Sequence, residues 1–358
     1  MSAYTPTVRA ADVGYGHIKF TEGRNEQGEI VTNSMPSQSP VAGPLYADGA
    51  GAALVMNRRD TFRVPVDGSV YEVGREVRFA LDPRHESEVL DTDFALSPSY
   101  AARLLGAVNY MLPGIPDYVI DLLVLGLPMN TYEKHQADLA QRFRGTHVIN
   151  ERGTTVKVTN CHVFPQPLGS YAAFIEEQWE GTDTPTALTI DPGYNTVDWF
   201  VCRGMAAHSL RSKAIERGVS SVLRAVATDV IKKLDFDAAE SEVVRAIDAS
   251  LTNGVPFKMY GQEFDLAEHM KAGDAVITEA AQAIKNSVGA GSDIDVIVMS
   301  GGGAALYASA VADKFPRLKV VTLDQPALAN VRGFQILGER LAGSLVRATR
   351  QQRDGAVA

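Results

Sequence analysis

The chain has 358 residues, of which 45% are hydrophobic and 22% are charged, and its formal net charge is −9. This length and balance predict a soluble globular protein of two domains and argue against wholesale disorder. The acidic balance argues against a direct hold on nucleic acid, because that kind of binding depends on clustered Lys and Arg.

Cysteine usage and apolar stretches point to the reducing cytoplasm. Cys161 and Cys202 are far apart and outside any CxxC pattern, so neither a disulfide framework nor a zinc module is predicted. The first residues lack the basic and apolar regions of a secretory signal. The longest apolar stretch, residues 118–129, is shorter than the roughly 20 residues that a membrane span needs. We therefore expect a cytoplasmic protein without a membrane partner.

The first part of the chain predicts a strand meander, with β-like runs at residues 8–11, 18–21 and 29–32. It carries an acidic, glycine-bearing turn over residues 12–19, with the sequence Asp-Val-Gly-Tyr-Gly-His-Ile-Lys. Farther on, Asp67 and Gly68 separate two short β-like runs, which is typical of a two-residue β-hairpin.

Helices and strands then alternate, which favours an α/β fold with a largely buried sheet. A helix is expected over residues 97–111, where apolar residues recur at helical spacing. The elements expected next are a strand at 118–127, a helix at 132–143, a strand at 154–158 and a helix at 170–179. We place the domain boundary near residue 165, because the pattern restarts after it.

The second half opens with a predicted hairpin, whose strands at 187–190 and 199–202 flank a second acidic turn over residues 191–198. A strand at 294–299 runs into Ser300-Gly301-Gly302-Gly303 and a helix from Ala304. The gross similarity of the two halves suggests duplication of one architecture. The other expected elements are helices at 219–234, 238–251 and 275–288, a short strand pair at 257–260 and 263–266, a strand at 319–323 and a final helix from 325 to 345.

The two acidic turns have the composition of a Mg-ATP site. Mg²⁺ keeps several waters and takes one or two carboxylates with phosphate oxygens, which suits Asp12 and Asp191. Glycines beside them would let successive N–H groups face phosphate without a Cβ in the way. Lys19 would add a positive charge and Thr196 a hydroxyl donor. Taken alone, either turn is more simply an ordinary hairpin in which Asp caps the backbone.

The glycine run at residues 300–303 is equally consistent with close packing of a strand against the following helix. It does not fit the Walker pattern, and no GxGxxG follows a strand, so P-loop and Rossmann folds are disfavoured.

The order of these parts resembles the actin-like ATPase superfamily. Residues 12–19 and 191–198 look like its two phosphate motifs, and residues 298–303 look like its adenosine motif. Residues 164–169 and 329–334 are similar to its connecting segments. Within the superfamily, the chain resembles the ParM/StbA plasmid-segregation actins and especially the protein D family of PRTRC gene clusters. That finer resemblance is carried by residues 12–16, 70–74, 122–128 and 165–169.

The resemblance implies a two-lobed actin-like α/β fold, in which each lobe is a mixed β-sheet flanked by helices. The lobes would be residues 1–165, completed by a C-terminal helix at 331–346, and residues 166–330, with a disordered tail at 347–358. ATP or ADP with Mg²⁺ would lie in an interdomain cleft.

The expected catalytic set is Gln166, Asp191 and Asp12, with the two aspartates holding Mg²⁺ through water. Gln166 would orient the attacking water rather than act as a base, because an amide takes no proton at neutral pH. Asp198 is left open between a role in the water network and exposed turn capping. The residues expected around the nucleotide are Gly14, Tyr15, Gly16, Lys19, Gly193, Tyr194, Asn195, Thr196, Gly218, Gly301, Gly302 and Gly303.

The resemblance implies an ATPase that polymerises into filaments and serves plasmid or DNA segregation through a DNA-binding adaptor. Two alternatives stay open: a small-molecule kinase or phosphatase of the same fold, which would need a second substrate pocket, and a nucleotide-dependent regulatory module that does not polymerise.

Overall fold

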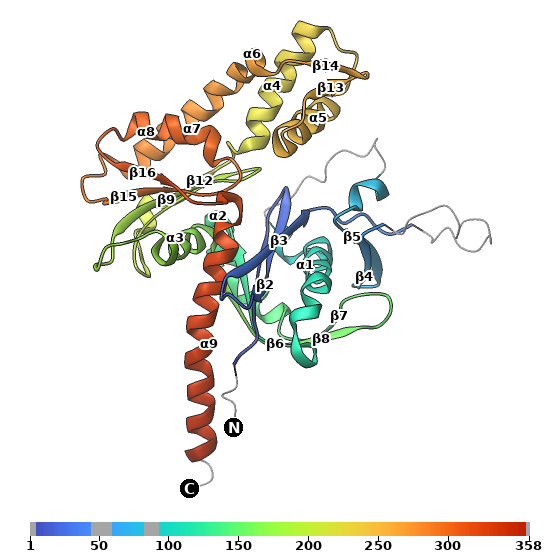
Figure 1. Cartoon of the computed structure of the whole chain (residues 1–358), viewed down its shortest axis with the longest axis vertical. Helices are drawn as coiled ribbons and strands as arrows, with labels where there is room; N and C mark the ends of the chain where they lie inside the picture. Colours follow the sequence, from blue (N-terminus) through green and yellow to red (C-terminus); the bar gives the residue numbers. More distant parts are fainter. Residues whose placement is uncertain (1–4, 44–58, 82–92, 356–358) are drawn as a thin grey trace, which may run out of the picture. The chain divides into compact units, whose positions relative to one another are not determined.

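The computed structural model describes residues 5–43, 59–81 and 93–355. The chain divides into two compact units, residues 1–178 with 330–358, and residues 179–329. Each unit has a mixed β-sheet flanked by helices and a hydrophobic core of its own (Figure 1). The α/β architecture predicted from the sequence is therefore confirmed.

The first unit is built on a six-stranded sheet with the order β3-β2-β1-β6-β8-β7. Strands β1, β6 and β8 run parallel, whereas β2, β3 and β7 pair antiparallel with their neighbours. The carboxyl ends of the three parallel strands consequently lie at one edge of the sheet. The strands are β1 (Val8–Val13), β2 (His17–Arg24), β3 (Ile30–Pro36), β6 (Val119–Leu127), β7 (Gly145–Val148) and β8 (Thr155–Pro165).

The described part of this unit also contains four α-helices and a hairpin. The helices are α1 (Pro98–Met111), α2 (Met129–Arg142), α3 (Gln166–Glu177) and α9 (Ala329–Gly355). The hairpin pairs β4 (Thr61–Val66) with β5 (Ser69–Gly74). Its turn residues Asp67 and Gly68 both have positive φ, as the predicted two-residue turn requires.

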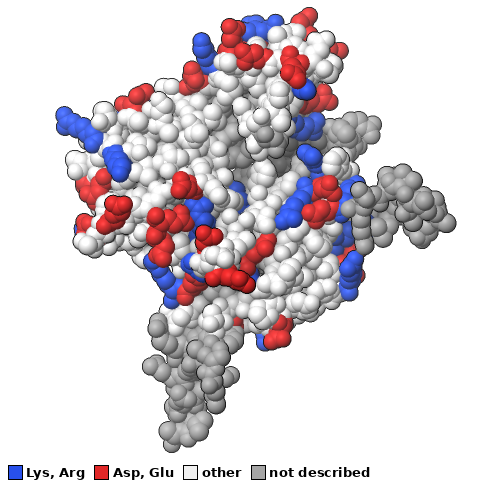
Figure 2. All heavy atoms as spheres, in the orientation of Figure 1, with Lys and Arg blue, Asp and Glu red and all other residues white. Residues whose placement is uncertain are grey.

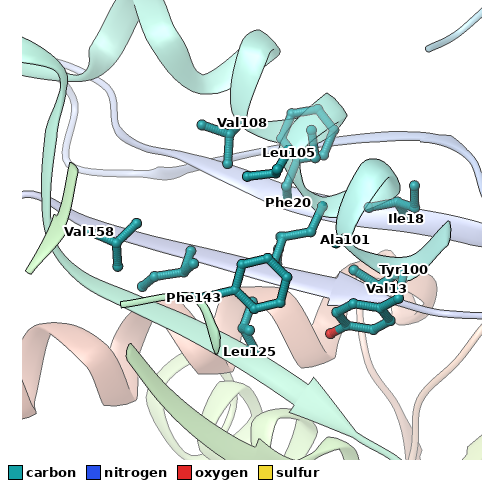
Figure 3. Packing of buried hydrophobic residues seen from close by; sticks show 14 of the residues in the cluster. Val13, Ile18, Phe20, Tyr100, Ala101, Leu105, Val108, Leu125, Phe143 and Val158 are labelled. Atoms are coloured by element: carbon teal, nitrogen blue, oxygen red, sulfur yellow. The ribbon is translucent and has the colours of Figure 1, made fainter. Parts of the chain in front are cut away.

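Helices cover both faces of the central strands. Leu123 and Leu125 of β6 belong to the core cluster that includes α1 and α2, and Figure 3 shows part of this packing around Tyr100 and Phe143. Leu122 and Val124 point to the opposite face, where α9 approaches so closely that a Cβ on Gly338 would lie 2.7 Å from Val124. A strand buried on both faces has to be apolar throughout, which explains the continuous apolar run.

Helices α3 and α9 cross at two glycines. A Cβ on Gly333 would collide with the carbonyl of Gly169, and Phe334 packs against the same backbone. The Ser170 hydroxyl donates to the side-chain oxygen of Asn330 beside this crossing. α3 therefore belongs to the first unit, which ends after Gln178 rather than at the predicted boundary near residue 165.

The second unit has a sheet with the order β11-β10-β9-β15-β16, and β12 pairs with β10. β9 runs antiparallel to β10 and parallel to β15. The strands are β9 (Thr186–Pro192), β10 (Val197–Arg203), β11 (Ala206–Ala207), β12 (Lys213–Ile215), β15 (Val296–Met299), β16 (Lys319–Thr322) and the separate pair β13 (Phe257–Met259) and β14 (Gln262–Phe264).

Helices of the second unit pack on the face of β9 that carries Leu188 and Ile190, together with the buried Trp199 of β10. The helices are α4 (Val219–Leu234), α5 (Glu240–Asn253), α6 (Ala267–Met270), α7 (Asp274–Val288) and α8 (Ala304–Lys314). Short 3-10 helices occur at Val77–Ala80, Phe94–Leu96, Leu112–Gly114, Pro116–Tyr118, Ser209–Arg211, Lys271–Gly273 and Pro326–Leu328.

Each unit contains the same pair of hydrogen bonds at the start of its central parallel strands. In the first unit, the N–H of Thr7 donates to Oδ2 of Asp121 at 2.7 Å, and the N–H of Asp121 donates to the carbonyl of Thr7 at 2.9 Å. In the second unit, Thr186 and Asp295 make the same pair of bonds at 2.8 and 2.9 Å. This repetition supports the duplication that the sequence suggests.

The structure differs from the sequence prediction mainly at element ends. β8 continues to Pro165, beyond the predicted strand end at residue 158, and α3 begins at Gln166, before the predicted helix start at residue 170. α9 runs to Gly355, so the expected tail is helical up to that residue, and residues 356–358 lie outside the described part. The tail has no proline and is rich in Arg, Gln and Ala, which favour helix. Among the described residues, the α-helices and strands not predicted are α6, β7, β11 and β12, and the short 3-10 helices are not predicted either.

No helix in the described part of the chain is long and apolar enough to cross a membrane. Figure 2 shows acidic and basic side chains interspersed over the face in view. A surface built to hold a phosphate backbone concentrates Lys and Arg instead.

We predict that both cysteines resist thiol reagents in the folded protein. Burial raises the pKa of the Cys161 and Cys202 thiols to about 12, so at pH 8 only about one thiol in ten thousand is the reactive thiolate. Iodoacetamide labelling followed by mass spectrometry should show no modification in buffer and two labels in urea. Rapid labelling of either cysteine in buffer would contradict this burial.

Candidate functional site

In the first unit, Asp12 lies at the end of β1 and is only 1% exposed. The hairpin register places Lys19 of β2 opposite it, with Nζ 3.8 Å from Oδ2 of Asp12. Between them the chain turns at Gly14, whose N–H donates to the carbonyl of His17 at 3.2 Å. The first acidic turn is therefore a hairpin tip that contains a buried carboxylate and a nearby ammonium group.

Gln166 reaches the same carboxylate from a distant part of the chain. It is the first residue of α3, directly after β8, and its Nε2 donates to Oδ1 of Asp12 at 2.6 Å. The amide nitrogen must face Asp12, because an ionised carboxylate only accepts hydrogen bonds. This hydrogen bond does not use Oε1 of Gln166, which is an acceptor. The shared edge of the parallel strands brings these two predicted residues together.

In the second unit, Asp191 and Asp198 lie within strands rather than in the turn. They are direct cross-strand partners of β9 and β10, and they are 6% and 2% exposed. The Thr196 hydroxyl donates to Oδ2 of Asp198 at 2.6 Å. Exposed turn capping by Asp198 is therefore wrong, since strand pairing buries it opposite Asp191. The Thr196 hydroxyl, predicted as a phosphate donor, is bonded to Asp198 in this structure.

The turn between these strands is joined to the start of α4. The carbonyls of Gly193, Tyr194 and Asn195 accept hydrogen bonds from the N–H groups of Val219, Ser220 and Gly218, at 3.0, 2.7 and 3.0 Å. These contacts satisfy N–H groups that a helix start otherwise leaves without partners. A Cβ on Gly218 would lie 2.6 to 2.7 Å from the turn backbone, so this approach requires glycine.

The same contacts fix where the turn's own donors point. Carbonyl and N–H of one trans peptide unit point in opposite directions. Because the carbonyls of residues 193–195 face α4, the N–H groups of Tyr194, Asn195 and Thr196 face away from it. Successive N–H groups on one side of a turn form a favourable site for an anion.

The glycine run after β15 lies directly against Asp191. Gly301 has φ of +76°, and a Cβ there would collide with Oδ1 of Asp191 and lie 2.7 Å from the carbonyl of Pro192. The N–H of Gly303 donates to that carbonyl at 2.9 Å. A Cβ on Gly302, in contrast, would meet nothing within 4 Å. The run therefore does more than pack a helix on a strand, because it also shapes the surroundings of a buried carboxylate.

The predicted residues thus form two sets, one in each unit. The set in the first unit consists of Asp12, Gly14, Lys19 and Gln166. The set in the second unit consists of Asp191, residues 193–196, Gly218 and residues 301–303. Tyr15 stacks on Phe94 with ring centroids 6.0 Å apart, and Gly16 accepts a hydrogen bond from the N–H of Ser37. Phe94 and Ser37 carry no motif, so the sequence gives no signal for these contacts.

The carboxylates have the chemistry that Mg²⁺ uses in nucleotide sites. In residues 5–43, 59–81 and 93–355, no group of three or more His, Cys, Asp or Glu could hold a metal ion. Each unit nevertheless offers buried carboxylate oxygens beside a glycine turn, and Mg²⁺ in nucleotide sites uses one or two carboxylates and keeps several waters.

Family models match most of both units. Residues 10–169 match the model for actin-like proteins, N-terminal domain, and residues 189–313 match the model for the archaeal actin homologue MreB-like, C-terminal. No curated protein matches the chain in sequence.

Solved structures match over nearly the whole chain. The archaeal actin homologue Ta0583 is 18% identical with a TM-score of 0.71, covering 93% of this chain and 99% of its own. The pSK41 ParM protein without nucleotide is 18% identical with a TM-score of 0.66, covering 95% and 99%. A ParM from Clostridium botulinum, solved as a 15-stranded filament, is 16% identical with a TM-score of 0.70, covering 94% and 100%.

We predict that Gly301→Ala destabilises the protein by about 1–3 kcal/mol, because alanine at positive φ is strained and its methyl group meets Asp191. Gly302→Ala is the matched control, since a methyl group there has open space. Urea unfolding followed by circular dichroism measures both variants. Equal stability of the two would contradict the close approach of Gly301 to Asp191.

Proposed function

We propose that the chain is an actin-like ATPase, which binds ATP with Mg²⁺, hydrolyses it and assembles into filaments; the two matching family models support this. The observation that carries the proposal is the turn at residues 193–196, whose N–H groups point away from α4 beside the buried carboxylate of Asp191. The Asp12 and Gln166 pair in the other unit supports it. A structure of the similar archaeal protein Ta0583 is a complex with ADP, which agrees with a nucleotide ligand.

In this proposal each unit contributes to the nucleotide site in a different way. The second unit supplies backbone donors to phosphate, and Gly302, where a Cβ would meet nothing within 4 Å, leaves room for the nucleoside. The first unit supplies Lys19 as a positive charge, Asp12 as a carboxylate, and the turn with Gly14, Tyr15 and Gly16 beside the phosphates.

Mg²⁺ would neutralise charge on the phosphate oxygens, and Asp12 and Asp191 would hold its water ligands. The buried positions of both carboxylates limit their contact with bulk water. Charge that is poorly screened acts strongly on a nearby cation. Asp198 lies directly opposite Asp191, and like charges across a strand pair repel. A cation held through water would reduce that repulsion, which gives Asp198 an indirect part in the site.

Gln166 would position the water that attacks the terminal phosphate. Its nitrogen is held by Asp12, so its orientation is fixed and Oε1 is left to accept a hydrogen bond from water. An amide does not become protonated at neutral pH, so Gln166 orients the water and does not remove its proton. Phosphoryl transfer depends mostly on positioning and on charge stabilisation.

Filament formation rests on the resemblance and on the solved relatives. A ParM similar to this chain is described as a 15-stranded filament, and Alp12 is likewise described as a filament. We extend the proposal to segregation of a plasmid or other DNA cargo in the cytoplasm, through a DNA-binding adaptor, as in the ParM/StbA and PRTRC proteins that the sequence resembles. The net charge of −9 agrees with DNA being held by a partner.

We expect Asp12→Asn and Asp191→Asn each to weaken Mg-ATP binding at least about tenfold, a loss of about 1.4 kcal/mol. Each removes one of the two buried charges, so a loss in both shows that both units contribute. Asp121→Asn and Asp295→Asn are matched controls, because their carboxylates bond strand backbone at the other end of each sheet. Isothermal titration calorimetry measures the four affinities. An unchanged affinity for Mg-ATP in both Asp12→Asn and Asp191→Asn would contradict the proposed nucleotide site.

We expect the protein to sediment as filaments with Mg-ATP and to release phosphate faster above a critical protein concentration. Gln166→Ala should still polymerise, but its phosphate release should slow by at least about tenfold, since orientation of the water is lost. Sedimentation, electron microscopy and a phosphate assay test this together. Absence of sedimentation would end the filament proposal, and stimulation by a small-molecule acceptor would favour a kinase instead.

A further inference from the structure

The first acidic turn, at residues 12–19, is supported by a buried arginine that belongs to none of the motifs. Arg103 lies in α1 and is 2% exposed. Its Nε donates to the hydroxyl of Ser39 at 3.0 Å, and its Nη1 donates to the hydroxyl of Ser37 at 3.4 Å. Burying a guanidinium is costly unless its donors have fixed partners. The side chain and the two serines therefore hold one defined arrangement.

A polar route leads from this arginine to the turn. Ser37 accepts the hydrogen bond from Arg103 with its hydroxyl, while its N–H donates to the carbonyl of Gly16 at 3.0 Å. Ser39 contacts the hydroxyl of Ser99 at 2.8 Å, which ties the same segment to α1. The orientation of the peptide unit that follows Gly16 thus depends on the segment that Arg103 fixes.

An aromatic route leads to the neighbouring residue. The guanidinium carbon of Arg103 lies 4.8 Å from the centre of the Phe94 ring, and Phe94 stacks on Tyr15. Cation–π contacts of this kind contribute most when they are desolvated. The two routes begin at one side chain and end at consecutive residues of the turn, Tyr15 and Gly16.

We propose that Arg103 is a positioning residue for nucleotide binding, which keeps the backbone of Tyr15 and Gly16 in the conformation that receives phosphate. This inference rests on the proposed function, because it assigns the turn to a nucleotide. Arg103 itself does not touch the ligand in this assignment. Its effect is preorganisation: a turn already held in the bound conformation loses less entropy when the ligand binds.

The test uses the full-length protein, with ADP and Mg²⁺ as the probe. Arg103→Met should raise the Kd about tenfold, as expected when a hydrogen-bonded support worth about 1.4 kcal/mol is lost. Ser37→Ala should also weaken binding, and adding it to Arg103→Met should cost little more, because both act on one route. Arg9→Met is the control, since Arg9 is a buried arginine of the same unit that bonds the carbonyls of Val8 and Gly114. It should lower stability and leave the Kd unchanged.

A second measurement tests, without nucleotide, whether Arg103 stabilises the conformation of the turn. The N–H of Ser37 should exchange with solvent faster in Arg103→Met than in the wild type, at equal global stability, by hydrogen-exchange NMR. A Kd within twofold of the wild type together with unchanged exchange would overturn the proposal. If the wild type itself binds no ADP, the proposed function fails, and the exchange rate of Ser37 still decides whether Arg103 holds the turn.

Discussion

A carboxylate buried at the end of a central strand must be stabilised locally, because removing its charge from water costs far more than an ordinary contact returns. Asp12 and Asp191 both occupy such positions, and the elements around them supply the partners. In the first unit, Asp12 receives a hydrogen bond from Gln166 and lies near Lys19. This pairing is possible because β1 and β8 run parallel and end at one edge of the sheet.

The second unit meets the same requirement differently. Asp191 is opposite another buried carboxylate, Asp198, whose hydrogen bond from Thr196 fixes its orientation. The glycine run then brings backbone rather than a side chain against Asp191, which only a residue without a Cβ allows at Gly301. The first unit therefore surrounds its carboxylate with side-chain donors, whereas the second concentrates negative charge beside backbone N–H groups.

The sequence predicts elements well where the signal is local. Helical spacing places α1 and α4, and the Asp67 and Gly68 pair fixes the β4 and β5 hairpin. Prediction fails where the deciding contact is distant: β8 runs on to Pro165 because it pairs with β6, and Asp198 is buried because strand register sets it opposite Asp191. Likewise, the sequence names Gln166 and Asp12 but cannot show their hydrogen bond.

The hydrogen-bond pairs of Thr7 with Asp121 and of Thr186 with Asp295 have a consequence for how the chain folds. Each pair joins residues more than a hundred positions apart in the sequence. Parallel pairing therefore requires closure of a long loop in either unit before the central strands gain their contacts, and such non-local topologies fold slowly. During synthesis, β1 leaves the ribosome well before β6, and β9 well before β15. Until β6 and β15 have been synthesised, the backbone groups of β1 and β9 that pair with them have no partner strand. Aggregation through these strand edges is therefore favoured during the two periods between synthesis of β1 and β6 and between synthesis of β9 and β15.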